Sequence, residues 1–187
     1  MIDGSLLLVQ ALNGLQFGVM LFLMAAGLTL IFGIMNLVNL AHGSLYMVGA
    51  YLASVFLART GSFALAVLLA LLATALIGIV VEVVVVRALY ARDHLDQVLA
   101  TFGLILFFNE IVRIVWGKAA LYMPLPGVLE GNVQILSGVR YPVYRVAIIA
   151  VGRAVALLLY LFIARTRLGM LIRAGASNRA MVGALGV

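Results

Sequence analysis

The chain has 187 residues, of which 66% are hydrophobic and only 10% are charged. Soluble domains carry about 25% charged residues, so this composition predicts an integral membrane protein. The chain contains no cysteine, which excludes a disulfide framework and thiolate metal sites. Its net charge of +6 comes from Lys and Arg residues scattered at the ends of apolar segments. That distribution argues against binding to nucleic acid and in favour of contact with membrane lipid.

Five apolar segments are each long enough to cross a bilayer core, which needs about 20 largely apolar residues. The N-terminus has Asp3 where a cleavable signal peptide would be positively charged, so the first segment is expected to stay in the protein. We predict an all-α, polytopic helical bundle that forms one transmembrane domain over residues 1–187. Its predicted spans are 12–35, 41–58, 62–86, 97–117 and 143–164.

Two features outside the spans bear on topology. Residues 119–142 contain all three prolines and are predicted to form an extramembrane loop. The side of the membrane that holds the 87–96 loop and the 165–187 segment carries more arginines than the other side. The positive-inside rule therefore places that side in the cytoplasm and the N-terminus outside.

Gly14 and Gly18 in the first span have the G-x-x-x-G spacing that lets membrane helices approach closely. We interpret them as a helix-packing feature rather than a functional one.

Four charged residues lie well inside the predicted spans, where charge is costly and often marks function. Glu110 and Arg113 are three residues apart and could pair with each other or snorkel to the interface. Arg153 lies near the middle of the fifth span and needs a partner, which could be structural, possibly in another chain, or part of a transport path. Glu82 lies near the inner end of the third span, where we expect it to pair with a nearby arginine.

A polar turn joins the first two predicted spans. No Asp, Glu, Lys or Arg occurs from Gly4 to Ala58, yet Asn36, Asn39, His42, Gly43 and Ser44 cluster between the two apolar segments. Few residues remain for a loop, so the turn is tight, and its polar side chains could satisfy backbone groups that line a wet cavity. Alternatively, they simply cap a short interfacial turn, with Ser44 or Asn39 at the start of the second helix.

Three runs carry a resemblance to a known family. They are G-L-T-L-I-F-G-I-M-N-L-V-N-L-A-H-G-S-L-Y-M-V-G-A-Y at 27–51, T-F-G-L-I-L-F-F-N-E-I-V-R-I-V-W-G at 101–117 and R-T-R-L-G-M-L-I-R-A-G-A-S-N-R-A-M-V-G-A-L-G-V at 165–187. All three resemble the LivH family, the permease subunits of bacterial ABC importers for branched-chain amino acids. The resemblance implies a multi-pass protein of the bacterial inner membrane. It also implies partners: a second permease of the LivM kind, two cytoplasmic ATPase subunits and a periplasmic substrate-binding protein.

The third run is similar to the family's cytoplasmic coupling segment, which docks on the ATPase. The resemblance implies a coupling role for seven of its residues. Small side chains there would let a short helix sit in a groove of the ATPase, and arginines could make charge-assisted contacts or act as positive-inside anchors. The seven residues are Arg165, Gly169, Arg173, Ala174, Ala176, Asn178 and Gly186.

The sequence points away from catalysis. It contains no G-x-x-x-x-G-K-[ST] phosphate-binding loop, so energy from ATP must come from partner subunits. Its two histidines, His42 and His94, have no metal-ligating neighbour at helical spacing, and we expect no cofactor and no enzymatic activity. Members of the family are longer, with further helices after the coupling segment, so we expect these 187 residues to be the first part of such a permease.

Two rival functions remain at this point. A turn with Asn and His between two helices is also compatible with an ATP-independent channel or facilitator for a small polar solute such as urea or an amide. The 165–187 segment favours the importer, because a facilitator has no need of an ATPase-docking segment. The other rival is a membrane scaffold that transports nothing.

Overall fold

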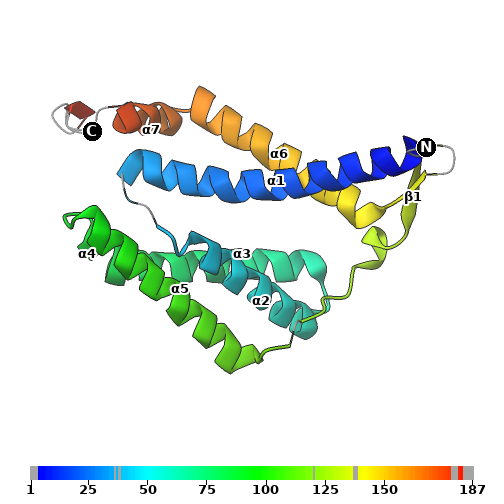
Figure 1. Ribbon diagram of the computed structural model, residues 1–187, viewed down its shortest axis with the longest axis horizontal. Coiled ribbons are helices and arrows are strands. Elements are labelled where there is room, and N and C mark those ends of the chain that lie inside the picture. The colour runs from blue at the N-terminus through cyan, green and yellow to red at the C-terminus, as the bar shows by residue number, and fades with distance from the viewer. Residues whose placement is uncertain are drawn as a thin grey trace. The chain divides into compact units, whose positions relative to one another are not determined.

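The computed structural model describes residues 4–35, 37, 39–119, 121–136, 139–177 and 181–182. Its elements are labelled in Figure 1. The chain separates into two compact units, each with its own internal packing. The terminal unit comprises Met1–Ile34 and Leu125–Val187, and the central unit comprises Met35–Pro124.

The terminal unit contains the first and last long helices. α1 (Gly4–Met35) packs against α6 (Val143–Arg165), and α7 (Arg167–Ser177) follows α6 after a bend at Thr166. Figure 1 shows α7 beyond the end of α6. Close approach of α1 and α6 depends on Gly152, because a Cβ at that position would overlap the Val19 side chain. Gly14 and Gly18, in contrast, have no described atom within 4 Å of where a Cβ would stand, so their spacing does not mark the α1–α6 contact.

A small β-hairpin precedes α6, inside the segment that the sequence predicts as loop. A short 3-10 turn, η2 (Gly127–Leu129), leads into β1 (Asn132–Leu136), which pairs antiparallel with β2 (Val139–Pro142). Val133 lies opposite Tyr141 in the register, and a bulge falls between Gln134 and Leu136. The prediction missed the hairpin because strands this short give a weak alternation signal beside prolines.

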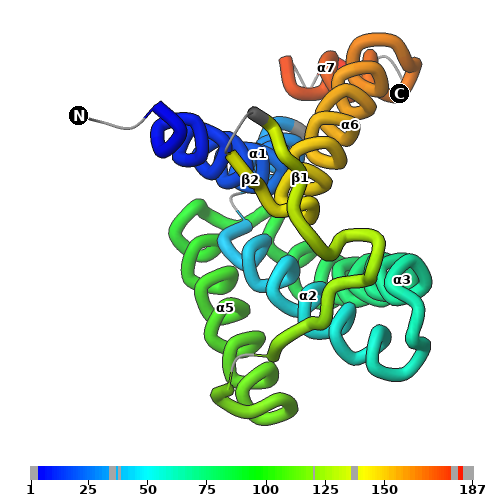
Figure 2. Tube along the Cα trace, turned by 90° about the vertical axis from the view of Figure 1, so that its right-hand side faces the viewer, coloured from blue at the N-terminus to red at the C-terminus, as the bar shows by residue number. Residues whose placement is uncertain are grey.

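The central unit is built from α2 (His42–Thr60), α3 (Phe63–Val81) and α5 (His94–Trp116). Between α3 and α5 the chain continues through a π-helical segment, η1 (Glu82–Val86), and a short helix, α4 (Arg87–Leu89). Gly61 joins α2 to α3 with φ of 64°, a left-handed conformation that favours glycine, and its N–H donates to the Leu57 carbonyl. Figure 2 shows α2 between α3 and α5.

The core of the central unit lies between α2 and α5. Val48, Phe108 and Val112 are buried there, and the rings of Tyr51 and Trp116 are tilted against each other with centroids 5.2 Å apart. Gly49 allows α2 to approach α3, since a Cβ there would stand 3.0 Å from Thr74 Oγ1. Many other large apolar side chains are exposed, which is the arrangement expected of helices that face lipid.

Four described helical stretches are long and apolar enough to cross a membrane: Gly4–Gly33, Phe63–Leu89, His94–Trp116 and Val143–Arg165. The predicted class, a polytopic α-helical membrane protein, is therefore confirmed. α2 has 19 residues and is not among the four, so five crossings remain a prediction. The first helix begins at Gly4 rather than at residue 12, because the stretch before it is also apolar and contains no helix breaker.

Candidate functional site

The turn before α2 is held by Asn39. Its side chain is buried, and its Oδ1 accepts a hydrogen bond of 3.0 Å from the N–H of Ala41. Its backbone carbonyl accepts from the N–H of His42 at 3.3 Å. Together these bonds form an Asx turn, in which an asparagine side chain stands in for backbone. The predicted candidate Asn36 lies outside the described residues.

The other turn residues occupy different environments. Ser44 is the third residue of α2 and is buried on the same face as Val48, so it does not cap the helix as expected. Capping requires a residue before the first turn, and Ala41 holds that position without a side-chain bond. His42 is partly exposed and Gly43 is exposed, with no described atom near where its Cβ would stand.

A second polar cluster surrounds the connection from α3 to α5. The Glu82 carboxylate, at the start of the π-helical segment, accepts a hydrogen bond from the Tyr90 hydroxyl. The expected arginine partner of Glu82 is not seen among the described residues, in which the single ion pair is Arg113–Glu110. A tyrosine satisfies the carboxylate without adding a second charge to a partly buried position.

Sequence reasoning missed Gln97 and Thr101, two buried polar residues one turn apart on α5. Gln97 Nε2 donates to the carbonyls of Leu89 at 3.2 Å and Arg92 at 3.1 Å, which ties the connection to α5. Thr101 Oγ1 donates to the Gln97 carbonyl at 2.8 Å. Gln97 Oε1 is buried without a partner in the described chain. The available signal was a glutamine and a threonine at i and i+4 near the start of an apolar helix.

The other charged residues predicted at membrane depth differ in whether they have a partner. Arg113 Nη1 lies 3.2 Å from Glu110 Oε1, so these exposed side chains form an ion pair one turn apart on α5. Arg153 is exposed in the middle of α6, and its guanidinium makes no hydrogen bond or ion pair with any described residue.

The bend between α6 and α7 is tightly built. Thr166 Oγ1 donates to the Phe162 carbonyl at 2.6 Å and accepts from the N–H of Gly169 at 3.0 Å. A Cβ at Gly169 would overlap the carbonyl oxygens of Phe162 and Ile163, so glycine is required there. The Arg173 guanidinium donates to the Ile163 carbonyl and thereby fastens α7 to the end of α6.

Other predicted coupling residues lie around this bend. Arg165 is the last residue of α6, and Ala174 lies on α7. Ala176, also on α7, lies close to Gly33 of α1: a Cβ placed on Gly33 would stand 3.9 Å from the Cβ of Ala176. Asn178 and Gly186 lie outside the described residues. α7 also exposes Leu168, Met170 and Leu171 beside its arginines, which gives it a mixed apolar and basic surface.

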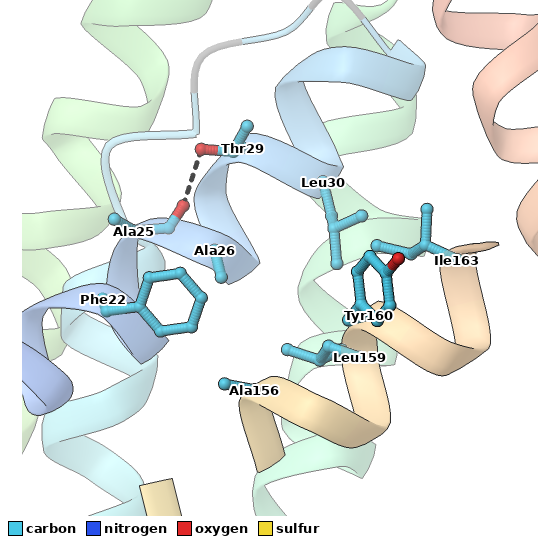
Figure 3. A pocket seen from close by; sticks show the side chains of 9 residues that line it. All are labelled: Phe22, Ala25, Ala26, Thr29, Leu30, Ala156, Leu159, Tyr160 and Ile163. Atoms are coloured by element: carbon cyan, nitrogen blue, oxygen red, sulfur yellow. Dashed lines mark hydrogen bonds between the residues drawn. The ribbon is translucent and has the colours of Figure 1, made fainter. Parts of the chain in front are cut away.

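An apolar groove of about 420 Å³ lies between α1 and α6 (Figure 3). Phe22, Ala26 and Leu30 line it from α1, and Ala156, Leu159 and Tyr160 from α6. Thr29 lies at the same groove, but its hydroxyl is bonded to the Ala25 carbonyl at 2.8 Å. The groove therefore offers mainly hydrophobic contact.

At the opposite end of α1, a polar network connects three elements. Asn13 Oδ1 accepts hydrogen bonds from the Tyr141 hydroxyl of β2, at 3.2 Å, and from the Arg145 guanidinium of α6. Tyr141 is almost fully buried. The network fixes the hairpin and the start of α6 to α1. Among the described residues no group of His, Asp or Glu is arranged to hold a metal.

Comparison with known proteins identifies the family. Residues 10–187 match the model of the branched-chain amino acid transport system permease component. The chain is 32% identical over 191 residues to the high-affinity branched-chain amino acid transport permease BraD of Pseudomonas aeruginosa. It is 26% identical over 193 residues to LivH of Salmonella typhimurium, and 25% identical over 196 residues to LivH of Escherichia coli K12.

Each of these alignments covers 96% of the chain, and the chain spans 62% of the length of the relative. No solved structure shows significant similarity to it. The family match extends over most of the chain and includes both units. The chain therefore belongs to the family of branched-chain amino acid transport permeases and is a multi-pass helical membrane protein.

Proposed function

We propose that the chain is part of a permease subunit of an ABC importer that carries branched-chain amino acids across the bacterial inner membrane. The observation that carries this proposal is the family match over residues 10–187. The named transport systems of its relatives supply the substrate class. The proposed partners are two cytoplasmic ATPase subunits, a second LivM-like permease and a periplasmic substrate-binding protein.

The geometry of α7 supports a coupling role for residues 165–187. A force from an ATPase reaches a membrane helix only if the docking helix is rigidly attached to it. Gly169 and Arg173 provide such an attachment through the carbonyls at the end of α6. The exposed Leu168, Met170 and Leu171 provide apolar surface that suits a groove on a partner. This assignment implies a cytoplasmic C-terminal segment and, with the five predicted crossings, an N-terminus outside.

The turn between α1 and α2 is proposed to shape the translocation path. Asn39 holds the turn through its bond to Ala41, which leaves the partly exposed imidazole of His42 at the start of α2. Asn36, Gly43 and Ser44 complete the proposed set. If these side chains line the path, replacing both Asn36 and His42 with alanine should lower uptake in the complete complex. Full uptake by the double variant contradicts the assignment.

A direct test of the function uses the native host. Two strains are made: one lacks the gene that encodes this chain, and the other lacks the genes for the ATPases that co-purify with it. Uptake of radiolabelled leucine, isoleucine, valine and urea is measured in each strain and in the parent. The proposal expects loss of branched-chain amino acid uptake in both deletions. Unchanged uptake in the permease deletion overturns it. Uptake that needs this chain but no ATPase indicates a facilitator. ATPase-dependent uptake of urea in place of the amino acids keeps the importer and overturns the substrate class.

A further inference from the structure

The first turn of α2 contains a backbone donor that the described residues leave unused. The N–H of His42 donates to the Asn39 carbonyl at 3.3 Å. The N–H of Ser44 donates to the Ala41 carbonyl at 3.0 Å. Between them, the N–H of Gly43 makes no hydrogen bond with any described residue. The N-terminus of a helix also carries about half a positive charge, so this free donor suits an anion.

A buried hydroxyl beside this donor is also without a partner. Ser44 is only 7% exposed, and its Oγ makes no hydrogen bond with any described residue. Side chains on an α-helix lean toward its N-terminus, so the Ser44 hydroxyl is directed to the same end of α2 as the free N–H of Gly43. A buried hydroxyl that lacks a partner costs free energy. Two such donors on adjacent residues indicate an acceptor from outside the helix.

Neither the backbone nor the packing of the described residues explains glycine at position 43. Its φ is not positive, since the glycines with positive φ are Gly61, Gly117 and Gly131. A Cβ at Gly43 would meet no described atom within 4 Å. Glycine is unfavourable inside a helix, so its presence needs another reason. Close approach of a ligand to the backbone supplies one, because a side chain at this position would stand beside the free N–H.

The turn offers hydrogen-bond donors without a fixed positive charge. No Lys or Arg occurs from Gly4 to Ala58. Asn39 Oδ1 is occupied by the N–H of Ala41, and Asn39 Nδ2 is a further donor without a described partner. Neutral donors hold a carboxylate less tightly than an arginine does, and a transported solute must be bound weakly enough to leave. The carboxylate is the hydrogen-bond acceptor of a branched-chain amino acid.

We propose that the first turn of α2 binds the carboxylate of the transported amino acid through the N–H of Gly43 and the hydroxyl of Ser44. The inference rests on the proposed function, which supplies an amino acid as the solute. The two carboxylate oxygens accept one bond each, and the positive end of α2 stabilises the negative charge. A neutral solute such as urea has a single carbonyl oxygen and no charge, so it gains less from this turn.

Two substitutions test the site in the complete importer. Gly43→Ala places a methyl group in the open space and meets no described atom, so the protein should reach the membrane in normal amounts. Gly43→Ala and Ser44→Ala should each lower leucine uptake about tenfold or more, because one blocks and the other removes a hydrogen bond to a charged group. Normal uptake by either variant overturns the proposal.

Gly103→Ala is the matched control. Gly103 lies on α5 in the same unit, and a Cβ there also has open space among the described atoms. This variant should keep uptake within about twofold of the parent. A loss in Gly103→Ala as large as in Gly43→Ala overturns the proposal, because added methyl groups would then act through the helices in general.

A solid-state NMR distance reads the contact without relying on uptake. The complex is prepared in lipid bilayers with 15N-glycine in the permease and is saturated with leucine that carries 13C at the carboxyl carbon or at the methyl carbons. His42–Gly43 is the single His–Gly pair of these 187 residues, so a parallel sample with carbonyl-13C histidine identifies the Gly43 nitrogen. Loss of that signal in Gly43→Ala confirms the assignment.

The carboxyl label is expected to dephase the Gly43 nitrogen signal, and the methyl label is not. No dephasing by the carboxyl label, or dephasing by the methyl label instead, overturns the site. The proposed function is judged separately, from leucine uptake by the parent and by the gene-deletion strain. Uptake that needs this chain, together with no dephasing, removes the carboxylate site and leaves the importer standing.

Discussion

Gly152 of α6 lies directly against Val19 of α1, and no other residue type fits between the two helices without displacement. Replacing Gly152 with alanine forces a methyl group into the Val19 side chain. We expect a loss of about 1–3 kcal/mol in the free energy of unfolding, which is the usual cost of overpacking. Thermal unfolding in detergent measures it.

The matched control is Gly18→Ala, one residue before Val19 on α1. A Cβ at Gly18 meets no described atom within 4 Å, so this variant should be neutral or slightly more stable, given the higher helix propensity of alanine. Equal losses in the two variants would show that Gly152 is not a packing position.

Gly169→Ala should uncouple α7 from α6. The added methyl group overlaps the carbonyl oxygens of Phe162 and Ile163 and must open the bend. Under the proposed function, uptake should fall at least tenfold while the amount of protein in the membrane changes little. The control is Gly175→Ala on the same helix, where a Cβ has open space among the described atoms. Equal uptake by the two variants would argue against a rigid connection.

Tyr141→Phe should loosen the hairpin without unfolding the helices. It removes the hydroxyl that donates to Asn13 while the buried ring stays. Removing one such bond costs about 1 kcal/mol. Cleavage by trypsin at the neighbouring Arg140 should accelerate several-fold, as followed by gel electrophoresis. Tyr144→Phe is the control. Among the described residues, its hydroxyl is bonded only to Arg145, so cleavage of this variant should be slower than cleavage of Tyr141→Phe.

Gln97 allows a charge test of the connection between α3 and α5. Its Nε2 donates to two carbonyls, so Gln97→Glu would place a carboxylate oxygen against the Leu89 and Arg92 carbonyl oxygens. Gln97→Met keeps the length and loses only the bonds. Amide hydrogen exchange over residues 87–93 should increase in both variants and more strongly in Gln97→Glu. The reverse order would contradict the donor assignment.

Composition and hydropathy predicted the fold class well, because burial in lipid requires long apolar helices whatever the details of their packing. Hydropathy could not predict Gly152, since its role depends on which residue of α1 lies opposite. Nor could it predict that Asn39, rather than Ser44, holds the turn, because both are common cap residues and only the helix start at His42 distinguishes them. The sequence did not predict Tyr90 as the partner of Glu82 because regular α-helical spacing does not align the two residues, and the π-helical segment between them does.

The π-helical segment changes the direction in which the side chains after it point around the helix axis. In a regular α-helix, Glu82 and Tyr90 would be about 80° apart around the axis, because eight residues turn through about 800°. One residue accommodated in the wide turn reduces the effective separation to seven, or about 20° from alignment. Glu82–Val86 therefore brings a carboxylate and a phenol onto one side of the helix. Deleting one valine from this run would restore α-helical geometry and leave the two residues seven apart, still aligned. Inserting one would rotate Tyr90 away from Glu82 unless the segment widened again. An insertion here thus acts as a rotation of the helix end, whereas a deletion leaves the two side chains on the same side.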